Sequence, residues 1–287
     1  MGKRFDSLVF PGGKSKACTF SYDDGVVQDR RLSPLLRERG IKCSFNLSSG
    51  LLGHSDAGGF PGKPDLDISK VETEEVLQLY SGHEIAGHSL YHSPLDTIGS
   101  PLAAYEIMED KRRLEQLSGK PLKMFAYPFG VYDHAVMELL RLAGYQGART
   151  IRSTRQFSIP ENFLEWDPTC HHNDPKLMDL AQEFLDGMPF FPMLFYVWGH
   201  AYEFDSDHNW QVIETLADFL ALHKDQIWFA TNGEILDYVT AYRRLIYSVD
   251  GSAIYNPSAA DVTIRTSMTQ TVLLKAGAVT RIGETPL

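Results

Sequence analysis

Short apolar runs alternate with amphipathic segments along most of the chain. The stronger runs are bounded by turn residues and predict strands buried on both faces: 17–22, 41–47, 83–87, 122–127, 193–199 and 227–230. Two weaker runs, 145–149 and 163–167, are further strand candidates. The stretches between these runs are long enough to hold helices.

The clearest helical segment is 101–117. Ser100 is a candidate N-cap, Pro101 stands at the first helical position and Gly119 follows the end, which is the usual order of these residues. Helical periodicity also marks other segments: 29–39, 73–81, 133–143, 208–223 and 233–244. Strands that alternate with helices predict parallel pairing through right-handed crossovers.

The alternation defines an α/β fold, and a (β/α) barrel, complete or incomplete, fits it best. A doubly wound open sheet is the alternative, although no G-x-G-x-x-G or Walker sequence supports a nucleotide site. From about residue 245 the pattern changes to period-2 stretches with an Asp-Gly turn, which indicates strands. We therefore expect a barrel domain over 1–244 and a small C-terminal β appendage over 245–287. Residues 50–72 read as a long surface loop.

Composition and charge narrow the class of protein. The 287 residues are 43% hydrophobic and 22% charged, as in soluble globular proteins. No apolar run approaches the roughly 18 residues of a membrane span, and the first residues show no secretory signal, so we expect a cytoplasmic protein that binds no membrane. A net charge of −10 argues against a nucleic-acid partner. Three scattered cysteines form no disulfide framework, and nothing indicates the oligomeric state.

Polar side chains follow several of the predicted strands. Asp23 and Asp24 come after the first run, His88 and His92 after the third, and His200 after the run 193–199. In a parallel barrel, the carboxyl ends of the strands form the active-site face. These side chains are therefore expected to converge.

Two histidines at i, i+4 with one carboxylate form a donor set typical of a catalytic metal site with open positions. One aspartate can then be a ligand while the other acts as a base, because a cation offsets the repulsion between two adjacent carboxylates. Each element alone is a weak signal: H-x-x-x-H recurs by chance, and Asp-Asp often caps a turn. A metal site is favoured because the histidines and the aspartates are all predicted to lie on the same face of the barrel.

These motifs resemble a known family. TFSYDDG, HSLYH, FAYPFG and WGH are similar, in this order, to the successive motifs of the polysaccharide deacetylase (NodB homology) family, carbohydrate esterase family 4. The resemblance covers roughly residues 15–235. It implies a distorted (β/α)7-type barrel and a metal-dependent hydrolase that removes acetyl groups from an N-acetylated or O-acetylated sugar or oligosaccharide.

The resemblance also implies roles for single residues. Asp23 would be the general base and His200 the general acid, while Asp24, His88 and His92 would hold a divalent metal. Zn²⁺ is the first candidate, with Co²⁺, Ni²⁺ or Mn²⁺ as alternatives. A metal-bound water would attack the acetyl carbonyl, since a bound ion lowers the pKa of its water to roughly 7.

Further residues of the motifs are candidates for substrate contacts. The family analogy points to the backbone N–H of Phe129 as an oxyanion donor, and Trp198 could wall the acetyl pocket. Tyr127 could stack on a sugar, but packing within the barrel explains it equally well. The chain departs from the family at Ala126, where many members have an arginine that tunes the base. Arg149 is the strand-end arginine that can replace it, or it merely closes a turn.

The segment CHHND adds His172 and Asp174, either as substrate-binding residues or as ordinary loop chemistry. Asp174 is a candidate partner that orients His200. Glu203, close to His200 in sequence, is a candidate rim residue or helix cap. Two other functions stay open: hydrolysis of a non-sugar amide on the same fold, and non-catalytic binding of carbohydrate.

Overall fold

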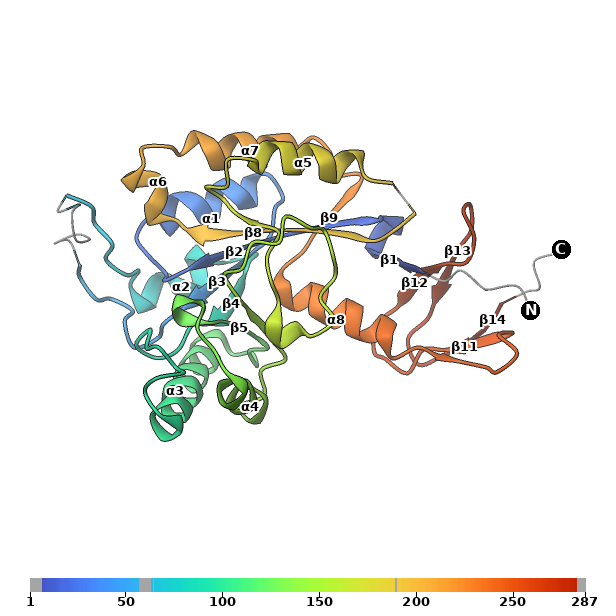
Figure 1. Cartoon of the computed structure of the whole chain (residues 1–287), viewed down its shortest axis with the longest axis horizontal. Helices are drawn as coiled ribbons and strands as arrows, with labels where there is room; N and C mark the ends of the chain where they lie inside the picture. Colours follow the sequence, from blue (N-terminus) through green and yellow to red (C-terminus); the bar gives the residue numbers. More distant parts are fainter. Residues whose placement is uncertain (1–6, 57–62, 64, 189, 283–287) are drawn as a thin grey trace.

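A curled sheet of parallel strands forms the centre of the molecule, and helices cover it (Figure 1). The computed structural model describes residues 7–56, 63, 65–188 and 190–282. The sheet has eight strands, seven of them in the continuous order β6-β5-β4-β3-β2-β8-β7. These strands span Gly147–Arg149 (β6), Met124–Ala126 (β5), Glu84–Gly87 (β4), Cys43–Leu47 (β3), Lys16–Asp23 (β2), Met193–His200 (β8) and Cys170–His171 (β7).

The eighth strand, β9 (Ile227–Phe229), pairs with the first residues of β2, below the point where β3 begins to pair. Every pairing within this sheet is parallel. The predicted α/β fold is confirmed, and its form is a half-barrel of parallel strands rather than a doubly wound sheet.

The helices follow the strands in the expected alternation. In Figure 1, α5 and α7 lie above the sheet, and α3 and α4 lie below it. Their bounds are Asp29–Glu38 (α1), Val76–Leu79 (α2), Ser100–Ser118 (α3), His134–Leu142 (α4), Leu177–Asp186 (α5), Tyr202–Ser206 (α6), Gln211–Ala221 (α7) and Asn232–Arg243 (α8).

Local sequence explains where the helices begin and end. In α3, Pro101 occupies the first turn, and Gly119 ends the helix with a left-handed φ of 67° that glycine adopts without strain. Gly99, not Ser100, takes the N-cap position, so the predicted cap is wrong by one residue. Thr231 and Glu234 form a capping box that starts α8.

The core lies on both sides of β2. All eight residues of this strand are buried, because β8 flanks one edge and β3 and β9 share the other. Large rings such as Phe20, Tyr22 and Phe45 are fully buried, and each contributes on the order of 1.5–3 kcal/mol by leaving water. A polar side chain at the end of such a strand is therefore held rigidly.

The predicted strand 163–167 is wrong. Phe163–Glu165 forms a short 3-10 helix, and only Trp166 bridges to Arg149 in parallel fashion. The next strand in the sheet is instead β7, which is too short to show a period-2 pattern. Helix α5 was not predicted either.

Antiparallel strands form two three-stranded sheets at one end of the molecule (Figure 1). One sheet joins β10 (Ile246–Tyr247), β11 (Ala253–Tyr255) and β14 (Val279–Arg281). The other joins β12 (Val262–Arg265) and β13 (Thr271–Leu274) to β1 (Ser7–Val9), so the N-terminal strand belongs to it. The division into domains 1–244 and 245–287 stays a prediction.

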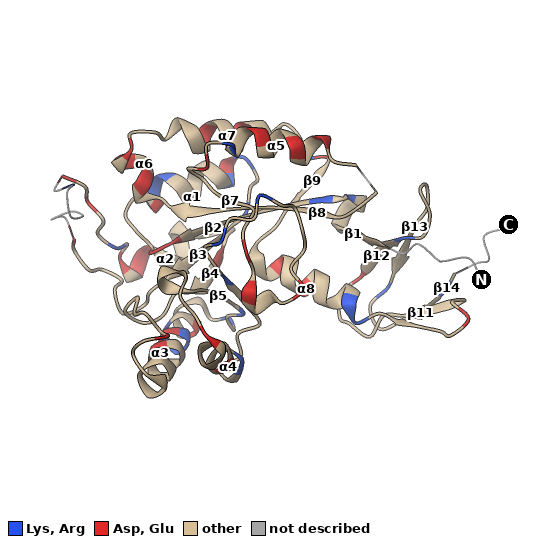
Figure 2. Ribbon diagram, in the orientation of Figure 1, with Lys and Arg blue, Asp and Glu red and all other residues tan. Residues whose placement is uncertain are grey.

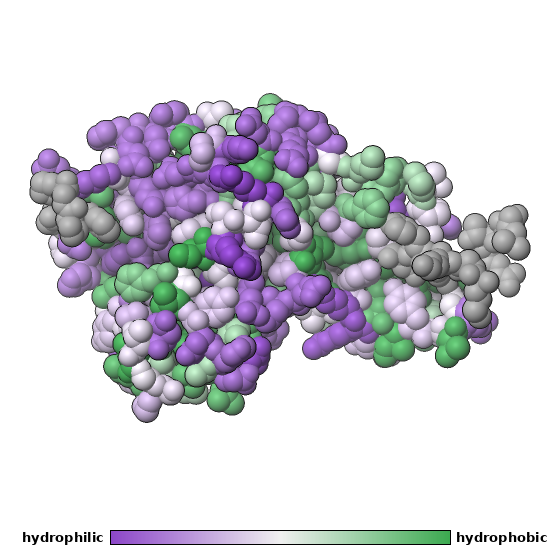
Figure 3. Space-filling model, viewed as in Figure 1, coloured by the Kyte–Doolittle hydropathy of each residue, from purple (hydrophilic) through white to green (hydrophobic). Residues whose placement is uncertain are grey.

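The surface differs between the two ends. Figure 3 shows apolar residues over the C-terminal strands, where Ile246, Val249 and Val279 are exposed. Figure 2 shows acidic residues along α5, α6 and α7. Within the part of the chain that the structure describes, no helix is long and apolar enough to cross a bilayer.

Candidate active site

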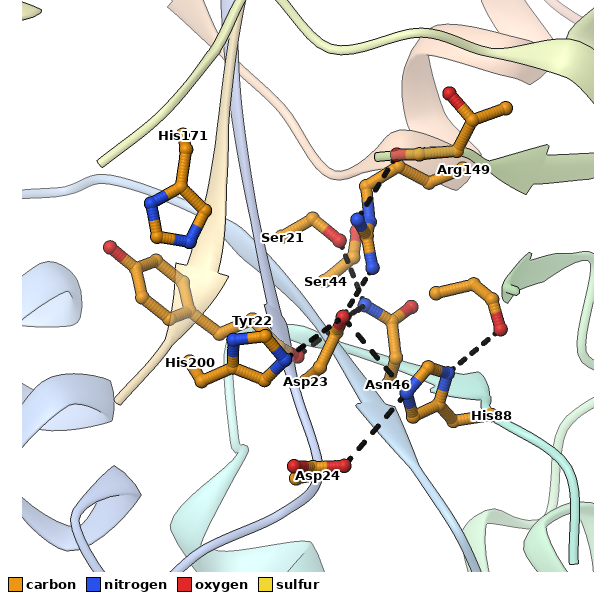
Figure 4. Close-up of polar contacts among 12 residues, drawn as sticks. Ser21, Tyr22, Asp23, Asp24, Ser44, Asn46, His88, Arg149, His171 and His200 are labelled. Carbon is orange, nitrogen blue, oxygen red and sulfur yellow. Dashed lines mark hydrogen bonds and ion pairs between the residues drawn. The ribbon is translucent and has the colours of Figure 1, made fainter. Parts of the chain in front are cut away.

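Polar side chains from several strands meet at the carboxyl edge of the sheet (Figure 4). The parallel register places Asp23 beside Asn46 on β3 and beside His200 on β8. His88 follows β4 directly, and Arg149 is the last residue of β6. The structure thus brings together side chains that are far apart in the sequence.

Asp23 is the most buried carboxylate of this group. Asn46 Nδ2 donates to its Oδ1 at 2.7 Å, the Arg149 guanidinium donates to Oδ2, and His200 Nε2 lies 3.9 Å from Oδ2. Burial alone would raise the pKa of Asp23, but the charges of Arg149, His88 and His200 hold it below its ordinary value. Asp23 is therefore ionised and able to accept a proton.

Arg149 provides the positive charge that Ala126 cannot. The two residues are register partners on β5 and β6, so the guanidinium arrives from the adjacent strand. Arg149 is fully buried, donates to the Thr150 carbonyl at 3.1 Å and lies 4.3 Å from the centre of the Trp198 ring. These contacts fix the guanidinium against Asp23.

Asp24, His88 and His92 form a separate cluster whose ligand atoms lie within 4.8 Å of one another. Asp24 Oδ1 is 3.8 Å from His88 Nε2 and 3.7 Å from His92 Nε2. Burial would raise the pKa of Asp24, yet Lys70 and the nearby histidines hold it well below its ordinary value. Burial and His88 lower the pKa of His92 to about 4, so this ring is neutral at pH 7.

The tautomer of His88 suits a metal. Its Nδ1 lies 2.7 Å from the Ala126 carbonyl and must donate there, which leaves a lone pair on Nε2. That Nε2 atom is buried and has no hydrogen-bond partner among the described residues. A divalent cation held by two imidazoles and one carboxylate would satisfy it, so the residues present fit the metal that the resemblance implies.

The backbone around this cluster is held in an unusual conformation. Four residues without glycine's freedom have left-handed φ angles: Asp24 (80°), Ser89 (62°), His92 (55°) and Phe129 (57°). Each such residue costs on the order of 1–3 kcal/mol, so the surrounding structure must enforce it. Strain of this kind gathers at functional sites.

Helix α3 holds the part of this backbone that follows β4. The Asp110 carboxylate accepts the backbone N–H of His88 at 3.2 Å and that of Ser49 at 2.8 Å. One turn earlier, Glu106 accepts the N–H of Tyr91 at 2.8 Å. Both acids are buried, and sequence reasoning missed them. The available signal was a pair of acids at i, i+4 on the apolar face of a helix.

His200 is held from its other side by Glu203. Glu203 Oε1 lies 3.4 Å from His200 Nδ1, and Oε2 accepts the His200 backbone N–H at 3.3 Å. Burial would lower the pKa of His200, but Glu203, Asp24 and Asp23 raise it above its ordinary value. The imidazole therefore binds a proton more firmly than a free histidine.

The remaining candidates lie at the rim or in the core. Trp198 is almost buried between Arg149 and His171. The Phe129 ring is 58% exposed and meets the His92 ring edge-on. Tyr127, by contrast, is buried, stacks on Tyr132 and donates its hydroxyl to the Leu164 carbonyl. The contacts of Tyr127 are thus those of a packing residue.

The residues of the segment CHHND have different surroundings in the structure. His172 is fully buried, with Nε2 3.0 Å from Glu203 Oε2. Asp174 pairs with Arg155 at 2.8 Å, and Glu203 stands in the position beside His200 that was expected of Asp174. His171 Nε2 also contacts Glu203, at 3.1 Å.

The fold is a half-barrel of parallel strands, and two histidines and one carboxylate cluster at the carboxyl ends of those strands. The protein is therefore of the barrel class, with a candidate metal centre. Residues 11–148 of this barrel match the family model described as polysaccharide deacetylase. This match confirms the resemblance to the polysaccharide deacetylase family that the four motifs indicate. No curated protein matches the chain significantly.

A solved structure shares the fold. A Mycobacterium smegmatis protein that is named as a polysaccharide deacetylase aligns at a TM-score of 0.58 and 16% identity, over 83% of this chain and 94% of that chain. The Streptococcus pyogenes deacetylase PplD aligns at 0.44 and 17%, over 51% of this chain and 61% of its own. A Bacillus anthracis pseudoenzyme of the CE4 family aligns at 0.48 and 14%, over 77% of this chain and 65% of its own. The chain thus spans less than two thirds of the last two proteins.

Proposed function

We propose that this protein is a metal-dependent hydrolase that removes acetyl groups from an N-acetylated or O-acetylated sugar or oligosaccharide. One observation carries the proposal: a candidate metal cluster, an ionised aspartate and a proton-binding histidine converge at one edge of the sheet. The match to the polysaccharide deacetylase family supports the substrate class.

In this proposal Asp24, His88 and His92 hold the divalent cation, with Zn²⁺ as the first candidate. The chemistry that a bound cation would supply there is Lewis acidity, toward the acetyl carbonyl and toward a water molecule whose pKa it would lower. Asp23, kept ionised by Arg149, takes the proton of the attacking water. Asn46 and the guanidinium fix the Asp23 carboxylate, so its free lone pairs face the site.

His200 acts on the opposite side of the reaction. Its raised pKa keeps a proton available on the imidazole, and Nε2 points toward Asp23 and the site. An amine leaves only when protonated, so His200 donates this proton as the C–N bond breaks. The Phe129 N–H is the proposed oxyanion donor, and Trp198 walls the space for the acetyl methyl.

Acetate release tests the proposal. The zinc-loaded protein is incubated with a panel of N-acetylated and O-acetylated mono- and oligosaccharides, beside a chelator-treated sample. We expect acetate that depends on the cation and that Asp23→Asn reduces by about 10²-fold or more, while metal content stays unchanged. Asp218→Asn is the matched control, because Asp218 is a surface carboxylate that pairs only with Arg39 among the described ion pairs.

Other outcomes separate the alternatives. Metal-dependent hydrolysis of a cyclic amide without acetate would replace the sugar substrate by a non-sugar amide. Binding of oligosaccharides without any turnover by the wild type would assign the protein to non-catalytic carbohydrate binding. Undiminished turnover by Asp23→Asn would place the base elsewhere.

A further inference from the structure

Three imidazoles surround a single carboxylate next to the candidate active site. Glu203, on the short helix α6, contacts His171 and His172 at the end of β7 and His200 at the end of β8. The three distances are 3.1, 3.0 and 3.4 Å. Such a cluster either holds a second cation or is a hydrogen-bonded support.

The tautomer of His171 decides between these two. Its Nδ1 accepts the backbone N–H of Asn173 at 3.1 Å, so the proton of the neutral ring sits on Nε2. Nε2 then donates to Glu203 and has no lone pair for a cation. His88 shows the opposite arrangement, with Nδ1 donating to a carbonyl and Nε2 free. The Glu203 cluster is therefore a support built on close contacts between the carboxylate and the imidazoles, rather than a second cation site.

Packing also holds this cluster in place. The His172 ring is fully buried, stacked on Phe204 at 4.2 Å and on Tyr22 at 5.6 Å between ring centres. A Cβ on Gly199 would lie 2.0 Å from His172 Nδ1, so the glycine of the WGH motif makes room for this ring. The His172 ring is thus tightly packed, and its Nε2 lies 3.0 Å from Glu203 Oε2.

We propose that Glu203 is a positioning residue for His200, anchored by His171 and His172. Two contacts reach His200 from one carboxylate: one to its backbone N–H and one to Nδ1. Glu203 thereby keeps the Nδ1 proton in place and turns Nε2 toward Asp23, where a leaving group would take its proton. This role rests on the proposed deacetylase function, whereas the contacts do not.

The groups around His200 determine how the loss of the Glu203 charge affects the titration of its imidazole. The groups that face the imidazole are the Glu203 carboxylate on Nδ1, the Asp23 carboxylate on Nε2, the nearby charge of Asp24, and the rings of Trp198, Tyr202 and His171. Removing the Glu203 charge takes away a hydrogen bond that favours the protonated ring. The midpoint of His200 titration then falls.

The test is Glu203→Gln in the zinc-loaded protein, followed by two measurements. Long-range ¹H–¹⁵N spectra of histidine-labelled protein give the tautomer and titration of His200, assigned against His200→Gln. We expect the His200 midpoint to fall by about one pH unit. The alkaline limb of kcat for acetate release falls with it, by up to about tenfold at a given pH, while KM and metal content stay unchanged.

A second test variant and a control variant accompany this experiment. His172→Phe keeps the stacked ring but removes the anchor of Glu203, so it shifts His200 in the same direction by less, and it serves if Glu203→Gln does not fold. Asp207→Asn is the matched control, because Asp207 follows α6 directly and pairs with Lys63 at the surface. We expect no shift from it.

Contrary outcomes are clear. An unchanged His200 titration in both Glu203→Gln and His172→Phe would overturn the inference, and so would loss of a second equivalent of zinc from Glu203→Gln. A wild type that releases no acetate would refute the proposed function instead, and the spectra of His200 would still decide the role of Glu203.

Discussion

The ion pair between Arg149 and Asp23 gives the sharpest prediction about stability. Both side chains are almost completely buried, at 0% and 3% exposure. Replacing Arg149 by Met keeps much of the side-chain volume but leaves the Asp23 carboxylate without its main counter-charge. Breaking a buried pair in this way costs on the order of 3–5 kcal/mol. That is a large part of the roughly 5–15 kcal/mol by which proteins are stable.

The assay is urea unfolding of cation-free protein at pH 7, because a bound cation would supply a second positive charge. We expect Arg149→Met to lower the free energy of unfolding by about 3–5 kcal/mol. Asp23→Asn combined with Arg149→Met recovers most of this loss, since it removes the uncompensated charge. Arg152→Met is the matched control, because the Arg152 side chain is 79% exposed and an ion pair to so exposed a guanidinium contributes about 0–1 kcal/mol.

The effect of pH has a definite sign. The folded-state pKa of Asp23 is depressed, so the stability from this pair is present above the unfolded value of about 4 and is lost as pH falls through the folded value. The gap between wild type and Arg149→Met therefore narrows in acid. A loss under about 1 kcal/mol at pH 7, equal to that of Arg152→Met, would refute the reasoning.

Three further predictions concern the metal cluster and its support. His92→Ala loses bound zinc because two ligands rarely hold a catalytic ion, whereas the surface control His134→Ala keeps it; full occupancy in the first would remove His92 from the site. Asp110→Asn weakens zinc affinity by about 10–100-fold in a competition titration, because the amide puts an NH₂ donor in place of one of the two oxygens that accept the Ser49 and His88 N–H groups; unchanged affinity would contradict this role. Gly199→Ala lowers the free energy of unfolding by about 1–3 kcal/mol, because the added methyl group clashes with the His172 ring. Adding His172→Ala restores most of this loss. An unchanged free energy of unfolding in Gly199→Ala would show that the ring can move.

Sequence reasoning located the strand ends because buried parallel strands are short apolar runs, and the polar residue that follows each is conspicuous. Asp23, Asp24, His88, His92 and His200 were found in this way, and the structure brings them to one edge of the sheet. Their roles stay proposals.

What the sequence could not show are contacts made across the fold. The closeness of Glu203 to His200 in sequence indicated a rim residue or a helix cap, but not that its carboxylate turns back to the imidazole. Asn46 is a polar residue inside an apolar run, which was a usable sign of a buried hydrogen bond. Helix α5 could also have been predicted, because its buried apolar residues recur at helical spacing: Leu177, Leu180, Ala181 and Phe184.

The pairing of β1 with β12 bears on how the chain folds. Ser7–Val9 aligns with residues 263–265, so its partner strand is made some 250 residues later. The Tyr238 hydroxyl links the two ends, donating to the Val9 carbonyl and accepting the Thr263 N–H. A chain emerging from the ribosome can assemble most of its half-barrel early, but β1 stays unpaired until β12 appears. Completion of the native structure is therefore a late event, and truncation before residue 262 leaves the first strand without a partner.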